Sequence, residues 1–482
     1  MLSGSEPACR YRGGVAKGTA SGRTGWVVAA LIVLVILVST NTWNPFPGIW
    51  EWVSASRPLA SPVVSWQERL GSGPQSVTFA GNAVIVEHRT SVESRGVSSG
   101  AQLWEKKGKD WAAVAGDGID SVVVVGELLT KGYEVLDPIS GQVRRSDDKA
   151  VAVWTYRNAL LDVRCGDAKD CQLTAWDPRG TSPMWTVDLP GIGFVLFADN
   201  PDLLDAKPLN TRRVEGGAGG PVIMPSLLGF PVDGRVRVVD TASGRSVQDF
   251  EPDRHDRNVV VGGRVIRVQA RSADGTCYFT VVASDPALQR EVWRHEAVNL
   301  RTADGAGCAQ RDDPSGGQNV IVAVTADGRE AVLDAYDGRV LWLGAHGDKL
   351  LAVDDRYAIV RASGAKSVTT YEFGVKRARW SYATEDPKAG VAITRFAVIV
   401  APEEPDRVVA LSPATGRPLA DVRSSAKVLA VGPTGMIIGE GREIGFVPFG
   451  GSVPPGSPGS VPLPADTSLC DGPKEPLCGK EK

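Results

Sequence analysis

An acidic residue followed eight positions later by a tryptophan recurs along the chain, and this spacing restricts the possible folds more than any other feature. The four pairs are Asp177 with Trp185, Asp285 with Trp293, Asp334 with Trp342, and Glu372 with Trp380. Residues 332–342, VLDAYDGRVLW, show the local pattern of a short β-strand, a tight turn with a glycine, and a second strand. Aspartate and glycine suit such a turn because the first caps the backbone and the second tolerates positive φ. The chain is therefore expected to contain repeated strand–turn–strand units.

Four further stretches are related to this form: the first one below keeps only the glycine and the tryptophan, and the other three keep the strand–turn–strand form with the tryptophan replaced. They are GVSSGAQLW ending at Trp104, VLDPISGQVRR from Val135, VVDTASGRSVQ from Val238, and ALSPATGRPLA from Ala410. The units then lie near Gly96, Asp137, Asp177, Asp240, Asp285, Asp334, Glu372 and Ser412. Their usual step of about 40 residues is the period of four-stranded propeller blades. One blade cannot bury both faces of its sheet, whereas a ring of blades can. The sequence predicts an all-β fold, an eight-bladed β-propeller over residues 76–449.

Composition is compatible with this fold and restricts the partners. Hydrophobic residues are 43% and charged residues 23% of the 482 positions, which is ordinary for a globular chain. Short apolar runs such as SVVVVGE from Ser121 are rich in β-branched residues, and no segment between 76 and 449 keeps a helical period. The net charge of -3 supplies no broad basic field, so nucleic acid is not expected as a partner.

An apolar run near the N-terminus predicts the compartment. Thirteen consecutive apolar residues extend from Trp26 to Val38, and neutral flanks lengthen the run to the roughly 19 residues that cross a bilayer. Basic residues precede it, at Arg10, Arg12, Lys17 and Arg23. The positive-inside rule therefore predicts a cytoplasmic tail over 1–24, a transmembrane helix over 25–43, and an extracytoplasmic remainder of a single-pass protein of the cell membrane. A cleaved signal peptide with a long basic region is the alternative.

The cysteines agree with an oxidising compartment. Cys9 falls in the predicted cytoplasmic tail, which leaves six outside, an even number. Nearest neighbours suggest three disulfides: Cys165 with Cys171, Cys277 with Cys308, and Cys470 with Cys478. Six cysteines allow fifteen pairings, so these remain candidates. A metal site is the rival interpretation, but the sequence has no CxxC and only four scattered histidines, so no metal is expected.

The repeat resembles that of pyrroloquinoline-quinone-like (PQQ-like, BamB-type) propellers, whose usual form is A-x-D-x-x-T-G-x-x-x-W. Residues 335–342, AYDGRVLW, and 411–420, LSPATGRPLA, are similar to eroded copies of it. The resemblance covers residues 76–449 and implies that each tryptophan docks its blade onto the next. The docking residues would be Trp104, Trp185, Trp293, Trp342 and Trp380. High usage of Arg, Val, Ala, Gly and Asp suggests a bacterial member.

The same resemblance implies two possible functions. Quinoprotein dehydrogenases of this family hold the quinone with calcium, acidic ligands and, in many members, a disulfide between adjacent cysteines. This chain has no adjacent cysteine pair, so no cofactor is expected. The other branch, which includes the lipoprotein BamB, consists of non-catalytic scaffold propellers. We therefore expect a tethered, non-enzymatic module that binds a protein or another component of the cell envelope. A PQQ- or metal-dependent oxidoreductase and an extracellular sensor remain the alternatives.

Two stretches break the repeat, and the ends of the chain differ from it. The step between Asp177 and Asp240 grows to 63 residues, and its surplus contains a candidate partner loop with Arg212 and Arg213. A second surplus surrounds Cys308. Residues 44–75 are expected to form a juxtamembrane linker with a possible ring-closing strand near PVVSWQERL. Residues 450–482 are rich in Pro, Gly and Ser and are expected to form a disordered tail.

Overall fold

The computed structural model divides the chain into two units, Met1–Arg57 and Pro58–Lys482, and the second is described below. It describes residues 58–450 except 62–63, 128–129, 167–169, 191–204, 207–211, 233, 254–255, 297, 301–303, 306–307, 310–314, 376, 385 and 405. The predicted cytoplasmic tail, the predicted transmembrane helix and almost all of the predicted C-terminal tail, with Cys470 and Cys478, lie outside the described residues. Within the described part of the chain, no helix is long and apolar enough to span a membrane.

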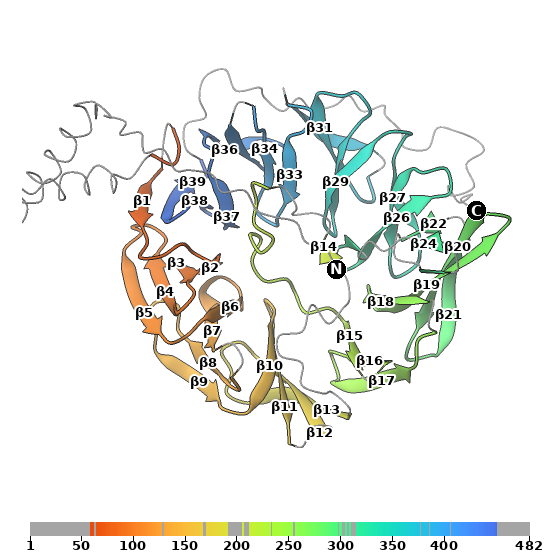
Figure 1. Cartoon of the computed structure of the whole chain (residues 1–482), viewed down its shortest axis with the longest axis horizontal. Helices are drawn as coiled ribbons and strands as arrows, with labels where there is room; N and C mark the ends of the chain where they lie inside the picture. The colour runs from red at the N-terminus through yellow and green to blue at the C-terminus, as the bar shows by residue number, and fades with distance from the viewer. Residues whose placement is uncertain are drawn as a thin grey trace, which may run out of the picture. The chain divides into compact units, whose positions relative to one another are not determined.

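The second unit is an all-β propeller in which sheets follow one another around a ring (Figure 1). In the described residues the one helical element is a short 3-10 turn, η1 (Gly118–Asp120). The first three blades are regular four-stranded antiparallel sheets. Blade 1 contains β2 (Ser76–Ala80), β3 (Ala83–Glu87), β4 (Ser91–Gly96) and β5 (Gln102–Lys107); blade 2 contains β6 (Trp111–Ala115), β7 (Val122–Gly126), β8 (Tyr133–Leu136) and β9 (Val143–Asp147); blade 3 contains β10 (Ala150–Thr155), β11 (Leu160–Cys165), β12 (Asp170–Trp176) and β13 (Pro183–Pro190).

The next three blades are less regular. Blade 4 contains β15 (Leu227–Val232), β16 (Arg235–Asp240) and β17 (Arg245–Phe250); blade 5 contains β18 (Arg257–Val261), β19 (Arg264–Ala273), β20 (Thr276–Asp285) and β21 (Arg290–His295); blade 6 contains β22 (Val298–Asn299), β25 (Ser315–Gly316), β26 (Val320–Thr325), β27 (Glu330–Asp334) and β28 (Val340–Leu343). Two small additions complete this region: β14 (Asp205–Ala206) joins the sheet of blade 6, and β23 (Asp304–Gly305) pairs with β24 (Cys308–Ala309).

The last three blades are again four-stranded. Blade 7 contains β29 (Lys349–Val353), β30 (Tyr357–Arg361), β31 (Ser367–Glu372) and β32 (Ala378–Ala383); blade 8 contains β33 (Gly390–Ile393), β34 (Val398–Ala401), β35 (Arg407–Leu411) and β36 (Pro418–Arg423); blade 9 contains β37 (Lys427–Val431), β38 (Gly435–Glu440), β39 (Glu443–Pro448) and β1 (Trp66–Arg69). β1 pairs antiparallel with β39, with Trp66 opposite Phe446, and so joins the two ends of the ring.

The described residues therefore form a ring of nine blades, and the predicted number of eight was wrong. The error has a structural cause, because the acidic residue and glycine used to count units lie in the turn between the third and fourth strands of a blade. In blade 9 these two strands are β39 and β1, which come from opposite ends of the chain. No turn joins them, so this blade has no copy of the pattern.

Both stretches that break the repeat enter the ring at first-strand positions. Blade 6 has its first strand in two pieces, β22 and β25, which both pair with β26 on either side of the surplus around Cys308. In blade 4 the described strands correspond to the second, third and fourth of other blades, because Asp240 marks the turn before β17. The surplus before β15 reaches other blades: β14 pairs in parallel with β25, and Val214 forms a parallel bridge with Val428 of β37.

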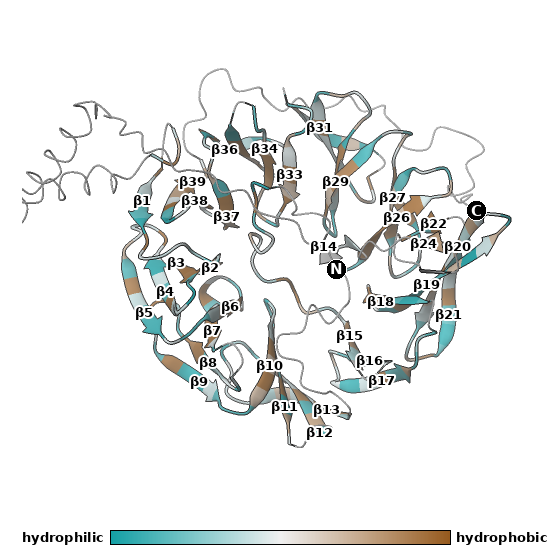
Figure 2. Ribbon diagram, viewed as in Figure 1, coloured by the Kyte–Doolittle hydropathy of each residue, from teal (hydrophilic) through white to brown (hydrophobic). Residues whose placement is uncertain are grey.

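In the first two blades, burial is higher in the second strands than in the first, and it is least in the fourth strands. Inner strands such as β3 and β7 are almost wholly buried, whereas fourth strands such as β5 and β9 are largely exposed. Figure 2 shows the same gradient, with hydrophobic residues on the inner strands and hydrophilic ones toward the outer strands. The cores lie between adjacent blades; one of them joins Val84 and Val86 of β3 to Ile437 and Phe446 of blade 9. Burial of this apolar surface between sheets is the main stabilising contribution expected in a ring of this kind.

Candidate functional site

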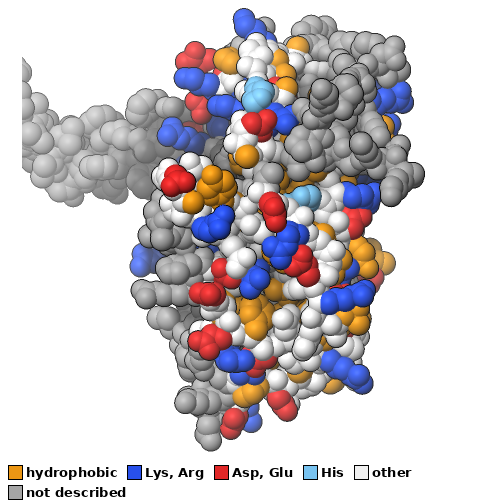
Figure 3. Space-filling model, turned by 90° about the vertical axis from the view of Figure 1, so that its right-hand side faces the viewer, with side chains coloured by type: hydrophobic (Ala, Val, Ile, Leu, Met, Phe, Trp, Pro, Cys, Tyr) orange, Lys and Arg blue, Asp and Glu red, His pale blue; other side chains and the backbone are white. Residues whose placement is uncertain are grey.

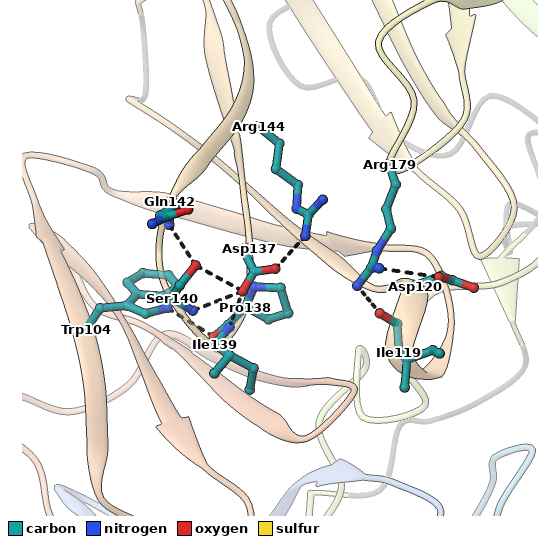
Figure 4. A network of polar contacts seen from close by, with 10 residues as sticks. All are labelled: Trp104, Ile119, Asp120, Asp137, Pro138, Ile139, Ser140, Gln142, Arg144 and Arg179. Atoms are coloured by element: carbon teal, nitrogen blue, oxygen red, sulfur yellow. Dashed lines mark hydrogen bonds and ion pairs between the residues drawn. The ribbon is translucent and has the colours of Figure 1, made fainter.

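Up-and-down connectivity gives the ring two unlike faces. The loops that join first to second strands and third to fourth strands all emerge on one face, which we name the turn face. The loops that join second to third strands, and the connections between blades, emerge on the opposite face. A contact across two blades agrees with this assignment, because Arg179 in the third-to-fourth turn of blade 3 lies 3.5 Å from Asp120 in the first-to-second loop of blade 2 (Figure 4).

Tryptophans on the fourth strands dock onto the turns of the following blades. In each case the indole Nε1 donates a hydrogen bond to a carbonyl oxygen of the next turn. These bonds run from Trp66 to Val97 (2.7 Å), Trp104 to Pro138 (3.0 Å), Trp185 to Thr241 (2.7 Å), Trp293 to Ala335 (3.1 Å) and Trp380 to Pro413 (2.8 Å). Each ring also covers the turn glycine, which has positive φ; these are Gly100, Gly141, Gly244, Gly338 and Gly416. Four of these tryptophans were predicted to dock, and Trp66 was missed because it stands on the closing strand.

Trp342 is also buried between blades, but in a different way. Its indole is 2% exposed and lies 6.2 Å from the ring of Tyr371, centroid to centroid. The next turn places Gly374 two positions after Glu372, whereas the glycines that receive a tryptophan lie four positions after the first residue of the turn. An added Cβ on Gly374 would meet nothing within 4 Å, so no indole covers it.

An arginine replaces the tryptophan between blades 2 and 3. Arg145 occupies the position eight residues after Asp137, donates a hydrogen bond to the Gly180 carbonyl oxygen (2.9 Å), and lies 4.3 Å from the ring centre of Trp176. The interface beside it is polar. Asp162 is fully buried on β11 and accepts hydrogen bonds from the Tyr133 hydroxyl (2.7 Å) and the Trp176 Nε1 (3.0 Å). Burial raises the pKa of Asp162, and burial together with Asp162 raises the pKa of Tyr133.

The described cysteines form two disulfides. Cys165 is bonded to Cys171 across the paired strands β11 and β12, and Cys277 on β20 is bonded to Cys308 in the blade 6 surplus. Both are pairings that the sequence suggested. The second bond ties the long hairpin of blade 5 to the surplus of blade 6, which restricts both in the unfolded chain. Within the described residues, no group of three or more His, Cys, Asp or Glu is arranged to hold a metal ion.

The candidate partner loop with Arg212 and Arg213 begins a segment that crosses the interior of the ring (Figure 1). Arg213 is buried, and its guanidinium donates hydrogen bonds to Asp406 (2.9 Å) and to carbonyl oxygens of blade 8 and the start of blade 9. The backbone pairs with β37 through the nitrogen of Val428, which donates to the Arg213 oxygen at 2.7 Å. The side chain of Arg213 is thus engaged in hydrogen bonds inside the fold, whereas Arg212 is exposed to solvent.

Farther along, the crossing segment reaches the turn face beside blade 3. The Arg157 backbone nitrogen donates to the Val222 carbonyl oxygen (2.7 Å), and the Asn158 side chain accepts a hydrogen bond from the Met224 nitrogen (2.8 Å). Gln318 of blade 6 donates to the carbonyl oxygen of Ile223. These bonds hold the backbone, while the side chains of Val222 and Ile223 are exposed to solvent.

The loop with η1 is clamped beside this segment by arginines from other blades. The Arg395 guanidinium from blade 8 forms two hydrogen bonds of 2.7 Å with the Asp117 carboxylate of blade 2. The hydrogen bonds from Arg395 hold the pKa of Asp117 below its usual value. Arg179 from blade 3 donates to the carbonyl oxygen of Ile119 (Figure 4). The Ile119 side chain, 80% exposed, is therefore presented on a loop whose backbone is fixed.

We name the group of Asp117, Ile119, Arg157, Val222, Ile223 and Arg395 the central patch. It lies where the blade 2 loop, the crossing segment and the blade 8 loop meet on the turn face. The sequence did not point to it, because its members come from four distant stretches and none of them belongs to the repeat. An apolar loop residue, as in GDGID at 116–120, is the one local signal that was present.

Two pockets lie on the face opposite to the turn face. One of about 470 Å³ is lined by Arg164, Asp170, Gln172 and Asp188 beside Cys171, and another of about 320 Å³ is lined by residues of blade 2 that include Lys109, Glu127 and Tyr133. Lys109 is held by Glu127 (3.1 Å) and Glu134 (3.2 Å). Both pockets are open to solvent, and most of the residues that line them are charged or polar. A predominantly hydrophobic and aromatic lining is more usual in small-molecule sites.

Comparison with known proteins finds only distant similarities. No model of a known protein family matches the chain, and no curated protein matches it. Among solved structures, BamB from Moraxella catarrhalis is 15% identical with a TM-score of 0.33, covering 75% of this chain and 98% of that chain. The quinohemoprotein alcohol dehydrogenase from Comamonas testosteroni is 11% identical with a TM-score of 0.37, covering 81% and 77%. The computationally designed Ika8 protein is 13% identical with a TM-score of 0.37, covering 79% and 98%. Values this low carry no argument about function.

Proposed function

We propose that this protein is a non-catalytic, protein-binding propeller of the cell envelope, tethered to the membrane by its N-terminal apolar segment. The observation that supports the binding role is the uneven distribution of exposed hydrophobic side chains. Six of them lie on the turn face: Ile119, Ile139, Val222, Ile223, Leu288 and Tyr336. The described second-to-third loops of the opposite face present no large exposed hydrophobic residue of this kind, although Tyr278 lies near the tip of the β19–β20 hairpin.

The remaining exposed hydrophobic residues are single ones on the fourth strands, namely Leu103, Val143, Met184 and Val292. The rim seen in Figure 3 mixes acidic and basic side chains with scattered hydrophobic ones. Scattered residues of this sort are normal on any surface. Three of the six turn-face residues, Ile119, Val222 and Ile223, lie on the η1 loop and the crossing segment, toward the centre of the face and on backbone that is held in place. Such an arrangement is more typical of an interaction site. The turn face is therefore the favoured binding face.

The test compares two matched surface variants of the full chain in intact membranes. Ile119→Asp places a charge at the centre of the turn face, and Leu103→Asp makes the same change on the fourth strand β5, where the side chain is 41% exposed. After crosslinking and quantitative mass spectrometry, the capture of at least one protein bound by the wild type should fall by about thirtyfold in Ile119→Asp, since a central apolar anchor contributes about 2 kcal/mol. Leu103→Asp should keep it. Equal capture by all three proteins would contradict the proposal, provided that their melting temperatures agree.

A cofactor titration tests the rival function. Pyrroloquinoline quinone is added to the purified full chain in detergent, with and without calcium, while tryptophan fluorescence and thermal stability are followed. A binding module should show no saturable change. A ligand that binds only the folded state raises its stability by RT ln(1 + c/Kd), where c is the free ligand concentration. A saturable fluorescence change, with a melting temperature that keeps rising with quinone concentration, would contradict the non-catalytic assignment.

A further inference from the structure

Two arginines of the central patch share one carboxylate. Asp117 is already paired with Arg395 through both of its oxygens, at 2.7 Å each. The Arg157 guanidinium lies farther from it, with Nη1 3.8 Å from the Asp117 Oδ2. Among the residues that the structure describes, this is the one ion pair of Arg157, and its Nε is buried without a hydrogen-bond partner. Asp117, Arg157 and Arg395 together carry a net charge of one positive unit.

The position of Arg157 makes this excess charge costly for the protein alone. Its side chain is 26% exposed, so part of its hydration is lost, and a like charge stands close by on Arg395. Burial, followed by repulsion from Arg395, lowers the pKa of Arg157. A guanidinium presents several donors in a plane that matches a carboxylate. Arg157 has donors left over, and an incoming carboxylate would supply both the missing charge and the missing acceptors.

The groups around Arg157 restrict what can carry that carboxylate. Ile119 and Val222 are exposed on the two segments that Arg157 contacts. Ile119 lies on the loop of Asp117, with which Arg157 is paired, and Val222 accepts a hydrogen bond from the Arg157 backbone nitrogen. A small inorganic anion would satisfy the arginine and leave this apolar surface in water. A peptide with an acidic residue between apolar ones would both bind the arginine and cover the apolar surface of Ile119 and Val222.

We propose that the central patch recognises an acidic residue flanked by apolar side chains on a protein partner, with Arg157 as the residue that binds its carboxylate. This inference rests on the proposed function and adds the chemistry of the partner to it. Ile119 and Val222 provide the apolar contacts, and Arg395 with Asp117 fixes the loop that presents Ile119. The acidic residue of the partner replaces water at Arg157 and neutralises the excess charge.

Fluorescence anisotropy with two pools of short peptides tests the assignment on the full chain in detergent. Both pools carry Leu, Ile, Val or Phe on each side of a central residue, which is Asp in one pool and Asn in the other. The wild type should bind the Asp pool about tenfold more tightly, because a charge-assisted hydrogen bond is stronger than a neutral one. Arg157→Gln should remove this preference, and Arg157→Lys should keep part of it.

Arg356→Gln is the control, because Arg356 is an exposed arginine of blade 7 that is already paired with Glu372 (2.8 Å). It should leave the preference for the Asp pool unchanged. Equal binding of the two pools, abolished by Ile119→Asp, would overturn the carboxylate assignment and leave the binding face in place. A preference that survives Arg157→Gln would overturn the role of Arg157, and so would a loss of equal size in Arg356→Gln. Binding of neither pool would overturn the partner chemistry.

Discussion

A tryptophan and a glycine from adjacent blades are the smallest unit that holds this ring together. The five tryptophans that donate to the next turn all face a glycine at the same turn position, with φ between 65° and 77°. Where that glycine is absent, the contact changes: Arg145 replaces the tryptophan in front of the blade 3 turn, and Trp342 packs beside Tyr371 in front of the blade 7 turn. Glycine serves two needs here, since it adopts positive φ without strain and leaves room for the indole. Docking therefore depends on two residues in different blades.

A substitution at Gly338, compared with one at Gly328, separates the effect of positive φ from the effect of the room needed by the indole. At Gly338 an added Cβ would lie 2.7 Å from the Trp293 ring, and φ is 77°. Gly328, in the same blade, has a φ of 83° and nothing within 4 Å of an added Cβ. Gly328→Ala should cost about 1 kcal/mol of unfolding free energy from backbone strain, and Gly338→Ala about 2–4 kcal/mol because the clash adds to the strain. Urea unfolding measures both. Equal losses would show that the indole moves aside without cost.

At the scale of the element, the acidic residue at the start of a turn holds the backbone of that turn through side-chain hydrogen bonds. The Asp137 Oδ1 accepts hydrogen bonds from the nitrogens of Ile139 (3.0 Å) and Ser140 (2.9 Å), and Oδ2 pairs with Arg144 at 2.6 Å (Figure 4). Asp285 makes the same two backbone contacts in blade 5. The repeat was visible in the sequence for this reason, because only a few residue types can make these bonds at these positions.

The turn of blade 2 should be sensitive to acid. The hydrogen bond from Arg144, aided by the Ser140 and Ile139 nitrogens and against the effect of burial, lowers the pKa of Asp137 to about 2. A carboxyl whose pKa is lower in the folded state stabilises the fold at any pH above its pKa in the unfolded state, which is near 4. It loses that contribution as the pH falls toward 2. Asp137→Asn has no such titration. The difference in unfolding free energy between wild type and Asp137→Asn should therefore shrink as pH falls from about 5 to about 3 in urea titrations. A difference that stays constant would mean that the ionised carboxylate contributes nothing.

For the whole molecule, the sequence predicted what repeats and missed what does not. The propeller, four of the docking tryptophans and both described disulfides follow from spacings and neighbours that are visible along the chain. The ninth blade was missed because β39 and β1 are joined by pairing and not by a turn. The central patch was missed because Asp117, Arg157 and Arg395 come together through the ring itself, over as many as 278 residues of chain. Contacts of this kind leave no local pattern in a single sequence.

Closure of the ring is the last feature that can be tested as a whole. β1 is a four-residue strand that holds blade 9 to the rest of the chain, and Trp66 docks it onto blade 1. Trp66→Ala and Trp104→Ala each remove one docking indole, and each should lower the unfolding free energy by up to about 3 kcal/mol. They should differ in where the protein opens. β5 is joined to its blade by a turn, whereas β1 is held by pairing with β39, so hydrogen exchange in Trp66→Ala should rise first in β1 and β39. If exchange in β1 of Trp66→Ala is no faster than exchange in β5 of Trp104→Ala, closure is not the weak point of the ring.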